Sequence, residues 1–96
     1  MTRTNLSDAI ARATRNGITV RLIRGTARQL HLWPFLTDEE GEFMRIELQF
    51  TYHPTHRMVA RHVPIQEASV MWEQVAAQIA DATEKLAEYV GLEVQP

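Results

Sequence analysis

The sequence predicts an α+β fold with a short N-terminal helix, a four-stranded antiparallel β-meander and a long C-terminal helix packed on one face of the sheet. Between residues 66 and 90, apolar side chains recur every three or four positions, which places them on one stripe of a long helix. They are Trp72, Val75, Ile79, Ala82, Leu86 and Tyr89. Between residues 18 and 64, apolar and polar residues alternate in four runs, as in strands that bury one face. A sheet with one apolar face needs a cover, and the long helix can supply it.

The first helix is expected to begin after Asn5 and to end before Gly17. The Asn5 side chain can accept a hydrogen bond from the first turn, and the carboxylate of Asp8 is stabilised near the positive end of a helix. Four apolar residues then share one face, namely Leu6, Ala9, Ile10 and Ala13. The pair Asn16-Gly17 is a typical helix stop.

Two strands are predicted next. The first contains Ile18, Val20 and Leu22, and the second contains Leu30, Leu32 and Leu36. A three-residue loop over 25–27 pairs Leu22 with Leu30. A two-residue loop would set Leu22 against the polar Gln29, so we expect the longer loop. Pro34 cannot donate a ladder hydrogen bond, and the second strand should therefore end, bulge or lie at an edge there.

The remaining two strands are predicted from Met44 to Tyr52 and from Arg57 to Pro64, with a turn over 53–56. The longer of the two alternates over nine positions and is the clearest strand in the sequence. Pro64 is expected to end the sheet, because the long helix starts shortly after it.

The register of this last pair follows from its apolar residues. A loop of two or four residues pairs Phe50 with Val59 and also turns Val63 inward. A loop of three or five residues would bury Met58 and Ala60 instead, so we prefer the register that buries the β-branched valines. This register sets Glu47 opposite His62 on the outer side of the sheet, and Ile46 opposite Val63 on the inner side.

The 96 residues are expected to form a single domain over 1–96, with residues 1–4 and 93–96 as frayed tails. No apolar run reaches the ~20 residues of a membrane span, and the first residues lack the apolar core of a signal peptide. The absence of cysteine excludes disulfides and cysteine-based sites, and it fits a reducing compartment. We therefore expect a soluble cytoplasmic protein with no membrane partner.

The formal net charge of −2 is distributed unevenly. Residues 1–36 carry six Arg against one Asp, residues 37–65 carry five acids against three Arg, and residues 66–96 carry six acids against one Lys. Such polarity can steer a partner or let two copies meet head to tail. It is equally compatible with two solvated faces of opposite sign.

Motifs for catalysis and for metal binding are missing from the sequence. Ser7 and Ser69 lie near the expected helix starts rather than in a nucleophile elbow, and no glycine-rich phosphate loop is present. The four histidines have no common metal-ligand spacing; they are His31, His53, His56 and His62. We therefore expect no enzyme, no cofactor and no metal site.

The outward face of the sheet is the first candidate for binding another protein. It is expected to display Arg, His and aromatic residues, and Arg and aromatic residues are common at the centre of protein interfaces. The candidates are Arg21, Trp33, Phe35, Arg45 and His62. The end of the long helix is a second candidate, with Leu86, Tyr89 and an acidic flank of Asp81, Glu84 and Glu88. Trp33 and Phe35 can alternatively fold over the sheet edge and cap the core.

Nucleic-acid binding is the alternative function. It would use the Arg-rich N-terminal half together with the Trp33 face of the sheet. The arginines are Arg12, Arg15, Arg21, Arg24 and Arg28. The predicted order of a helix, three or four antiparallel strands and a final helix resembles the double-stranded-RNA-binding fold. That family opens its last helix with a basic cluster, where this chain has Gln66-Glu67-Ala68, so RNA binding is not carried over.

The function expected from the sequence is that of a non-enzymatic protein-interaction module. Small size, the absence of a catalytic motif, the use of Arg and the split charge suit a homodimeric accessory protein or a phage-type inhibitor that binds a host protein. A third class is a structural subunit or chaperone whose acidic helix face holds a basic client.

Overall fold

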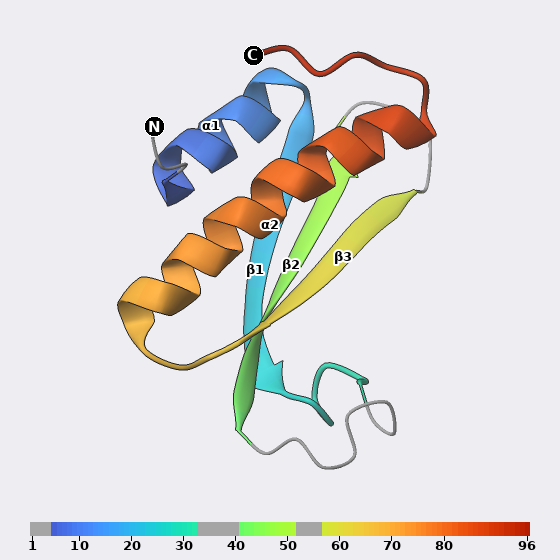
Figure 1. Ribbon diagram of the computed structural model, residues 1–96. Helices are drawn as coiled ribbons and strands as arrows, with labels where there is room; N and C mark the ends of the chain where they lie inside the picture. Colours follow the sequence, from blue (N-terminus) through green and yellow to red (C-terminus); the bar gives the residue numbers. More distant parts are fainter. Residues whose placement is uncertain (1–4, 33–40, 52–56) are drawn as a thin grey trace.

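The computed structural model describes residues 5–32, 41–51 and 57–96. The elements follow in the order α1 (Leu6–Arg15), β1 (Ile18–Thr26), β2 (Glu42–Phe50), β3 (Met58–Pro64) and α2 (Ala68–Tyr89) (Figure 1). Among the described residues the sheet has three strands in the order β1-β2-β3, and both pairs are antiparallel. The predicted α+β class, the antiparallel sheet and the covering C-terminal helix are confirmed.

α1 begins and ends as its sequence predicts. The Asp8 N–H donates to Asn5 Oδ1 over 2.8 Å, which caps the first turn. Ala9 and Ala13 are buried, and their small side chains allow α1 to pack closely beside α2. Gly17 adopts a φ of 75°, a left-handed conformation that glycine reaches without steric cost, and this turn leads the chain into β1.

The predicted second strand is the main difference between expectation and structure. β1 continues to Thr26, through most of the expected loop, and Leu22 pairs with Ile46 of β2 rather than with Leu30. Residues 27–31 form a turn, which we call the 27–31 turn. The last apolar residue of the predicted strand, Leu36, lies outside the described residues.

A capping box explains why the chain turns after β1. The Gln29 N–H donates to Thr26 Oγ1 over 3.2 Å, and the Thr26 N–H donates to Gln29 Oε1 over 2.9 Å. This reciprocal pair starts a helical turn, and such local bonds compete with strand formation. The Leu30 N–H then donates to the Thr26 carbonyl over 3.0 Å, as in a turn of α-helix. Leu30 therefore packs from a turn rather than from a strand, and Leu32 follows directly after this turn.

β2 and β3 pair two residues away from the predicted register. Val59 lies opposite Leu48 instead of Phe50, and Val63 is offset by the same amount. Side chains alternate with a period of two, so a slip of two residues leaves every side chain on its own face. The choice of face was therefore correct, and both valines are buried.

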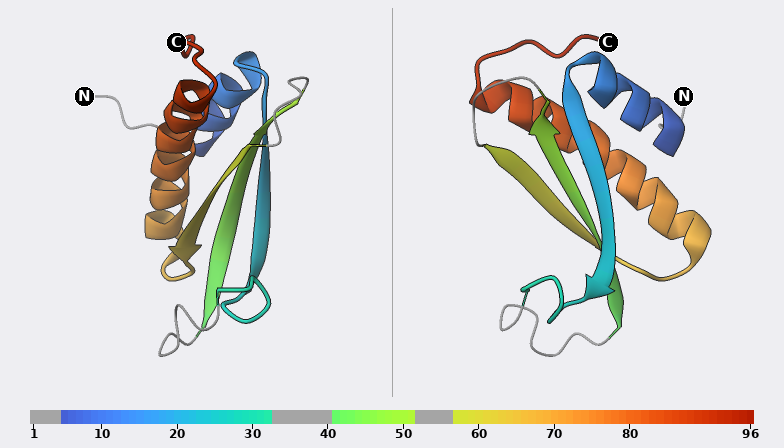
Figure 2. Two further views of the ribbon diagram at one scale, coloured as in Figure 1. Left: turned by 90° about the vertical axis from the view of Figure 1, so that its right-hand side faces the viewer. Right: turned by 180° about the vertical axis from the view of Figure 1, so that it is seen from behind.

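The core lies between the sheet and the two helices, which cover the same face of it (Figure 2). The middle of the predicted stripe on α2 is fully buried, namely Val75, Ile79, Ala82 and Leu86. They meet inward-facing residues of the sheet, including Ile46, Leu48, Val59 and Val63. Thr83 is also buried, and its hydroxyl donates to the Ile79 carbonyl over 2.8 Å, so burial leaves this polar group satisfied.

The two ends of the stripe are exposed. The start of α2 extends past β1 (Figures 1 and 2), and Trp72 keeps 37% of its surface in contact with solvent. Tyr89 is exposed at the other end. Leu86, predicted to be available to a partner, is instead completely buried in the core.

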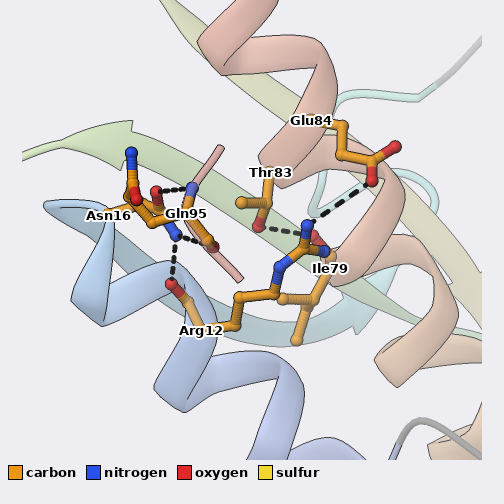
Figure 3. Close-up of polar contacts among 6 residues, drawn as sticks. All are labelled: Arg12, Asn16, Ile79, Thr83, Glu84 and Gln95. Atoms are coloured by element: carbon orange, nitrogen blue, oxygen red, sulfur yellow. Dashed lines mark hydrogen bonds and ion pairs between the residues drawn. The ribbon is translucent and has the colours of Figure 1, made fainter. Parts of the chain in front are cut away.

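The C-terminal residues return to the end of α1. The Asn16 side chain accepts a hydrogen bond from the Gln95 N–H over 2.7 Å and donates one to the Gln95 carbonyl over 3.0 Å (Figure 3). Residues 93–96, expected to be a frayed tail, are therefore tied to α1 at Gln95. In the part of the chain that the structure describes, no helix has the length and hydropathy needed to cross a membrane.

Candidate functional site

The face of the sheet that points away from the helices is the candidate site, and we call it the open face. In the left view of Figure 2 both helices lie on one side of the sheet. The alternation of each strand directs a second set of residues to the other side. They are Thr19, Arg21 and Ile23 of β1, Phe43, Arg45, Glu47 and Gln49 of β2, and Met58, Ala60 and His62 of β3.

Four polar side chains on this face form a chain of contacts across all three strands. Arg45 Nε donates to Glu47 Oε2 over 2.7 Å, and Arg45 Nη1 lies 3.0 Å from His62 Nε2. Arg21 Nη1 reaches Glu47 Oε1 at 3.4 Å. The observed register creates this arrangement, because it sets His62 opposite Arg45, where we had expected Glu47.

The centre of this network is shielded from water although neither helix covers the open face. Only 14% of the Glu47 side chain and 22% of the Arg45 side chain are exposed. The outer member, Arg21, is 68% exposed. The pair Arg45 and Glu47 is therefore held in place, whereas the guanidinium of Arg21 can still reach a ligand.

The contact with Arg45 determines the protonation of His62. A guanidinium can only donate hydrogen bonds, so His62 Nε2 must be the acceptor and the ring is neutral. Burial, and after it the positive charge of Arg45, lowers the pKa of His62, and the opposite effect of Glu47 is smaller. Both observations describe a neutral imidazole at neutral pH.

A hollow of about 400 Å³ lies beside the network. Ile23, Leu30 and Leu32 give it apolar walls, and Arg45 and Glu47 line its polar side. The apolar walls belong to a second small core in which Ala27, Leu30 and Phe43 are buried. The hollow thus exists because the 27–31 turn packs onto the open face.

Two backbone features position this turn. Gly25 lies beneath it, and a Cβ at this position would come within 3.2 Å of Leu30 Cγ, so the glycine permits the close approach. His31, which also lines the hollow, adopts a φ of 60°, a left-handed conformation that costs a non-glycine residue about 1–2 kcal/mol. Strained residues of this kind are often found at functional sites.

The residues predicted for partner binding are distributed as follows. Arg21, Arg45 and His62 come together on the open face. Trp33 and Phe35 lie outside the described residues. Leu86 is in the core, and Tyr89 lies at the far end of α2, where the guanidinium of Arg57 is 5.6 Å from the centre of its ring. The acidic flank of α2 is paired with bases, through Arg61 to Asp81, Arg12 to Glu84 and Lys85 to Glu88.

The sequence also contained a signal for the 27–31 turn that the strand prediction missed. Thr26 and Gln29 have the spacing of a capping box, which marks a helical start even where only one turn follows. Recognising it would have placed Leu30 and Leu32 in a turn. It would not have shown which face of the sheet they cover.

The arginines predicted for nucleic-acid binding do not form one surface. Arg12 contacts Glu84 of α2 at 3.6 Å (Figure 3), and Arg24 binds both carboxylate oxygens of Glu42 at 2.7 and 3.0 Å. Arg21 and Arg24 belong to opposite faces of β1. Arg15 is exposed on α1, and Arg28 is exposed on the 27–31 turn.

Two of the four histidines, His31 and His62, lie within the described residues. His53 and His56 lie outside the described residues. Within residues 5–32, 41–51 and 57–96, no three His, Asp or Glu side chains converge in a way that could hold a metal ion.

Comparison of the chain with protein-family models, with curated protein sequences and with solved structures finds no match.

Proposed function

We propose that this protein is a non-enzymatic protein-interaction module that binds another protein with the open face of its sheet. The proposal rests on two features of the face that the helices leave uncovered: a hollow with apolar walls and a charge network that spans three strands. Interfaces of this kind concentrate binding energy in an apolar pocket and in arginine contacts. A network that is already ordered loses little side-chain entropy on binding.

The same contacts support a binding role over a catalytic one. Glu47 uses one carboxylate oxygen for Arg45 and the other for Arg21, and His62 Nε2 accepts from Arg45. A general acid or base must be able to contact the group that exchanges its proton. In these two residues the proton-accepting atoms are already in contact with arginine.

Site-specific photo-crosslinking tests the proposal. A photoreactive amino acid replaces Gln49, which is exposed on the open face, and in a matched variant it replaces Gln74, which is exposed on the solvent side of α2. Each variant is irradiated in native lysate of the source organism with nuclease present. We expect a discrete protein adduct at position 49 and none at position 74, detected by mass spectrometry.

The contradicting outcomes are also specific. Equal adducts at both positions, or an adduct at position 74 alone, would mean that the open face is not the binding surface. Adducts at position 49 that appear only without nuclease would favour the predicted alternative, nucleic-acid binding. Homodimer formation and the role of a phage-type inhibitor of a host protein stay predictions within this proposal.

A further inference from the structure

We infer that the segment bound by the open face is acidic and carries one bulky apolar side chain, which enters the hollow between β1, β2 and the 27–31 turn. This inference rests on the proposed function and names the chemistry of the partner. It depends on three properties of the described residues: the walls of the hollow, the surplus of positive charge around it, and the poor fit of a second copy.

The hollow fits an apolar anchor. Its volume of about 400 Å³ falls within the range of about 300–1,000 Å³ that is common for ligand pockets. Ile23 and Leu32 are only partly buried, so each keeps apolar surface that a bound side chain can cover. Leu30 also lines the hollow, and it is buried in one cluster with Phe43. A leucine or an aromatic side chain of the partner would remove this apolar surface from water.

The charges around the hollow favour carboxylates on both sides of that anchor. Arg45 is neutralised by Glu47 at 2.7 Å. Arg21 is held more weakly, at 3.4 Å, and is largely exposed, while Arg28 is exposed on the turn that forms one wall. Among the described residues, this face therefore keeps a surplus of positive charge next to the apolar walls of the hollow. Complementary charge on the partner increases its association rate and selects against basic segments.

A second copy of this chain fits the face poorly. In a two-fold symmetric dimer the same patch meets itself, so the exposed Arg21 and Arg28 would face a surface with the same surplus of positive charge. A nucleic-acid strand would supply negative charge, but bases bind single-strand sites by stacking on exposed aromatic rings. Of the described Phe, Tyr and Trp residues, the one on the open face is Phe43, and it is buried. An acidic polypeptide segment satisfies both the hollow and the charges.

Selection from a random-peptide library tests the inference. The library is selected on the wild-type protein and counter-selected on Leu32→Asp, which places a charge in the apolar wall. We expect the enriched peptides to share acidic residues on both sides of one Leu, Ile, Phe or Trp. Enrichment of basic peptides, of peptides without a bulky apolar residue, or of none at all would overturn the inference.

Fluorescence anisotropy with one enriched peptide provides the matched comparison. Arg21→Gln removes a cation from the open face, and Arg24→Gln removes one from the other face of the same strand at similar exposure, 68% against 63%. We expect Arg21→Gln to raise the Kd about two- to fivefold, which corresponds to the loss of one exposed ion pair. Salt screens such a pair, so the difference in Kd should vanish at high salt. Arg24→Gln should leave the Kd unchanged. Equal Kd values for the two variants would overturn the charge argument.

Two further measurements keep the interpretation clear. Circular dichroism shows whether Leu32→Asp is folded, and Arg21→Gln tests the same surface without any change in the walls of the hollow. An oligonucleotide of mixed sequence serves as a competitor. If the oligonucleotide displaces the labelled peptide and the unlabelled peptide does not, the open face binds nucleic acid and the inference is overturned. If position 49 still crosslinks to a protein while the peptides lack the expected pattern, this inference fails and the proposed function stands.

Discussion

At the scale of single residues, His62 shows how its neighbours favour the neutral form of an outward-facing side chain. Its Nε2 accepts a hydrogen bond from Arg45, so a proton on this atom would break the contact and bring two positive charges together. Partial burial of the ring, and after it the positive charge of Arg45, lowers the pKa of His62. In the unfolded chain the ring keeps its ordinary pKa of about 6.5.

This difference in pKa predicts a pH dependence of stability. Below about pH 6.5 the unfolded chain takes up a proton at His62 that the folded chain does not, so the free energy of unfolding falls as the pH falls through the folded-state pKa. Above that range His62 contributes no pH dependence. In His62→Gln the amide oxygen can still accept from Arg45 but does not titrate. Urea unfolding at several pH values should therefore show a smaller acid loss in this variant than in the wild type, and identical losses would contradict the prediction.

At the scale of elements, the 27–31 turn decides what the open face looks like. Its start is fixed by the local pair Thr26 and Gln29, whereas its position on the sheet depends on Gly25 below and on the contact of Leu30 with Phe43. The hydrogen bonds between Thr26 and Gln29 join residues that are close together in the sequence. The contact of Leu30 with Phe43 joins residues that are far apart in the chain, and it appears only when β1 and β2 are paired.

Gly25→Ala tests the packing of this turn. The added Cβ would lie 3.2 Å from Leu30 Cγ and 3.3 Å from Gln29 Oε1, so the turn has to move. Overpacking typically costs about 1–3 kcal/mol, while replacing glycine in a strand gains about 0.5–1 kcal/mol. We expect a net loss of about 1 kcal/mol in the free energy of unfolding, measured by urea denaturation. The double variant Gly25→Ala/Leu30→Ala no longer has the clash with Leu30. Its loss in the free energy of unfolding should therefore be smaller than the sum of the losses in the two single variants.

An unchanged unfolding free energy in Gly25→Ala would show that the turn yields without cost. In that case the walls of the hollow would be easily deformed, and they could not select a side chain by its shape.

At the scale of the whole molecule, the helices and the open face divide the roles of core and contact surface. α1 and α2 cover one side of the sheet, and the core residues of all three strands point toward them (Figure 2). The other side keeps a charge network and a hollow. The start of α2 is a third surface, because it extends beyond the sheet and exposes Val70 and Trp72.

The homodimer predicted from the sequence is tested at this third surface. Burial of Val70 and Trp72 between two copies would remove apolar area from water without using the open face. Static light scattering of the purified protein is expected to give twice the chain mass of 11.0 kDa at high concentration. Trp72→Glu should shift the mass to that of one chain. A mass of one chain for the wild type at every concentration would contradict the prediction.

The period of each helix and strand could be read from the sequence, and this period predicts on which side a buried residue lies. The intervals of three and four in α2 predicted Val75, Ile79 and Ala82 as core, and the alternation in β2 and β3 predicted Val59 and Val63 as inward. These predictions depend only on helix and strand geometry. For the same reason the outward positions of Arg21, Arg45 and His62 could be predicted.

Three features depend on contacts between residues distant in the chain: the strand that pairs with β1, the alignment of β2 with β3, and the place where the turn after β1 packs. Leu22 had two apolar partners of equal quality in the sequence, Leu30 and Ile46, and the pairing along all nine residues of β1 favours β2. A slip of two residues leaves the burial pattern unchanged, so the pattern could not show that His62 faces Arg45. The candidate site arises from these choices, because its charge network and its hollow are contacts between residues distant in sequence.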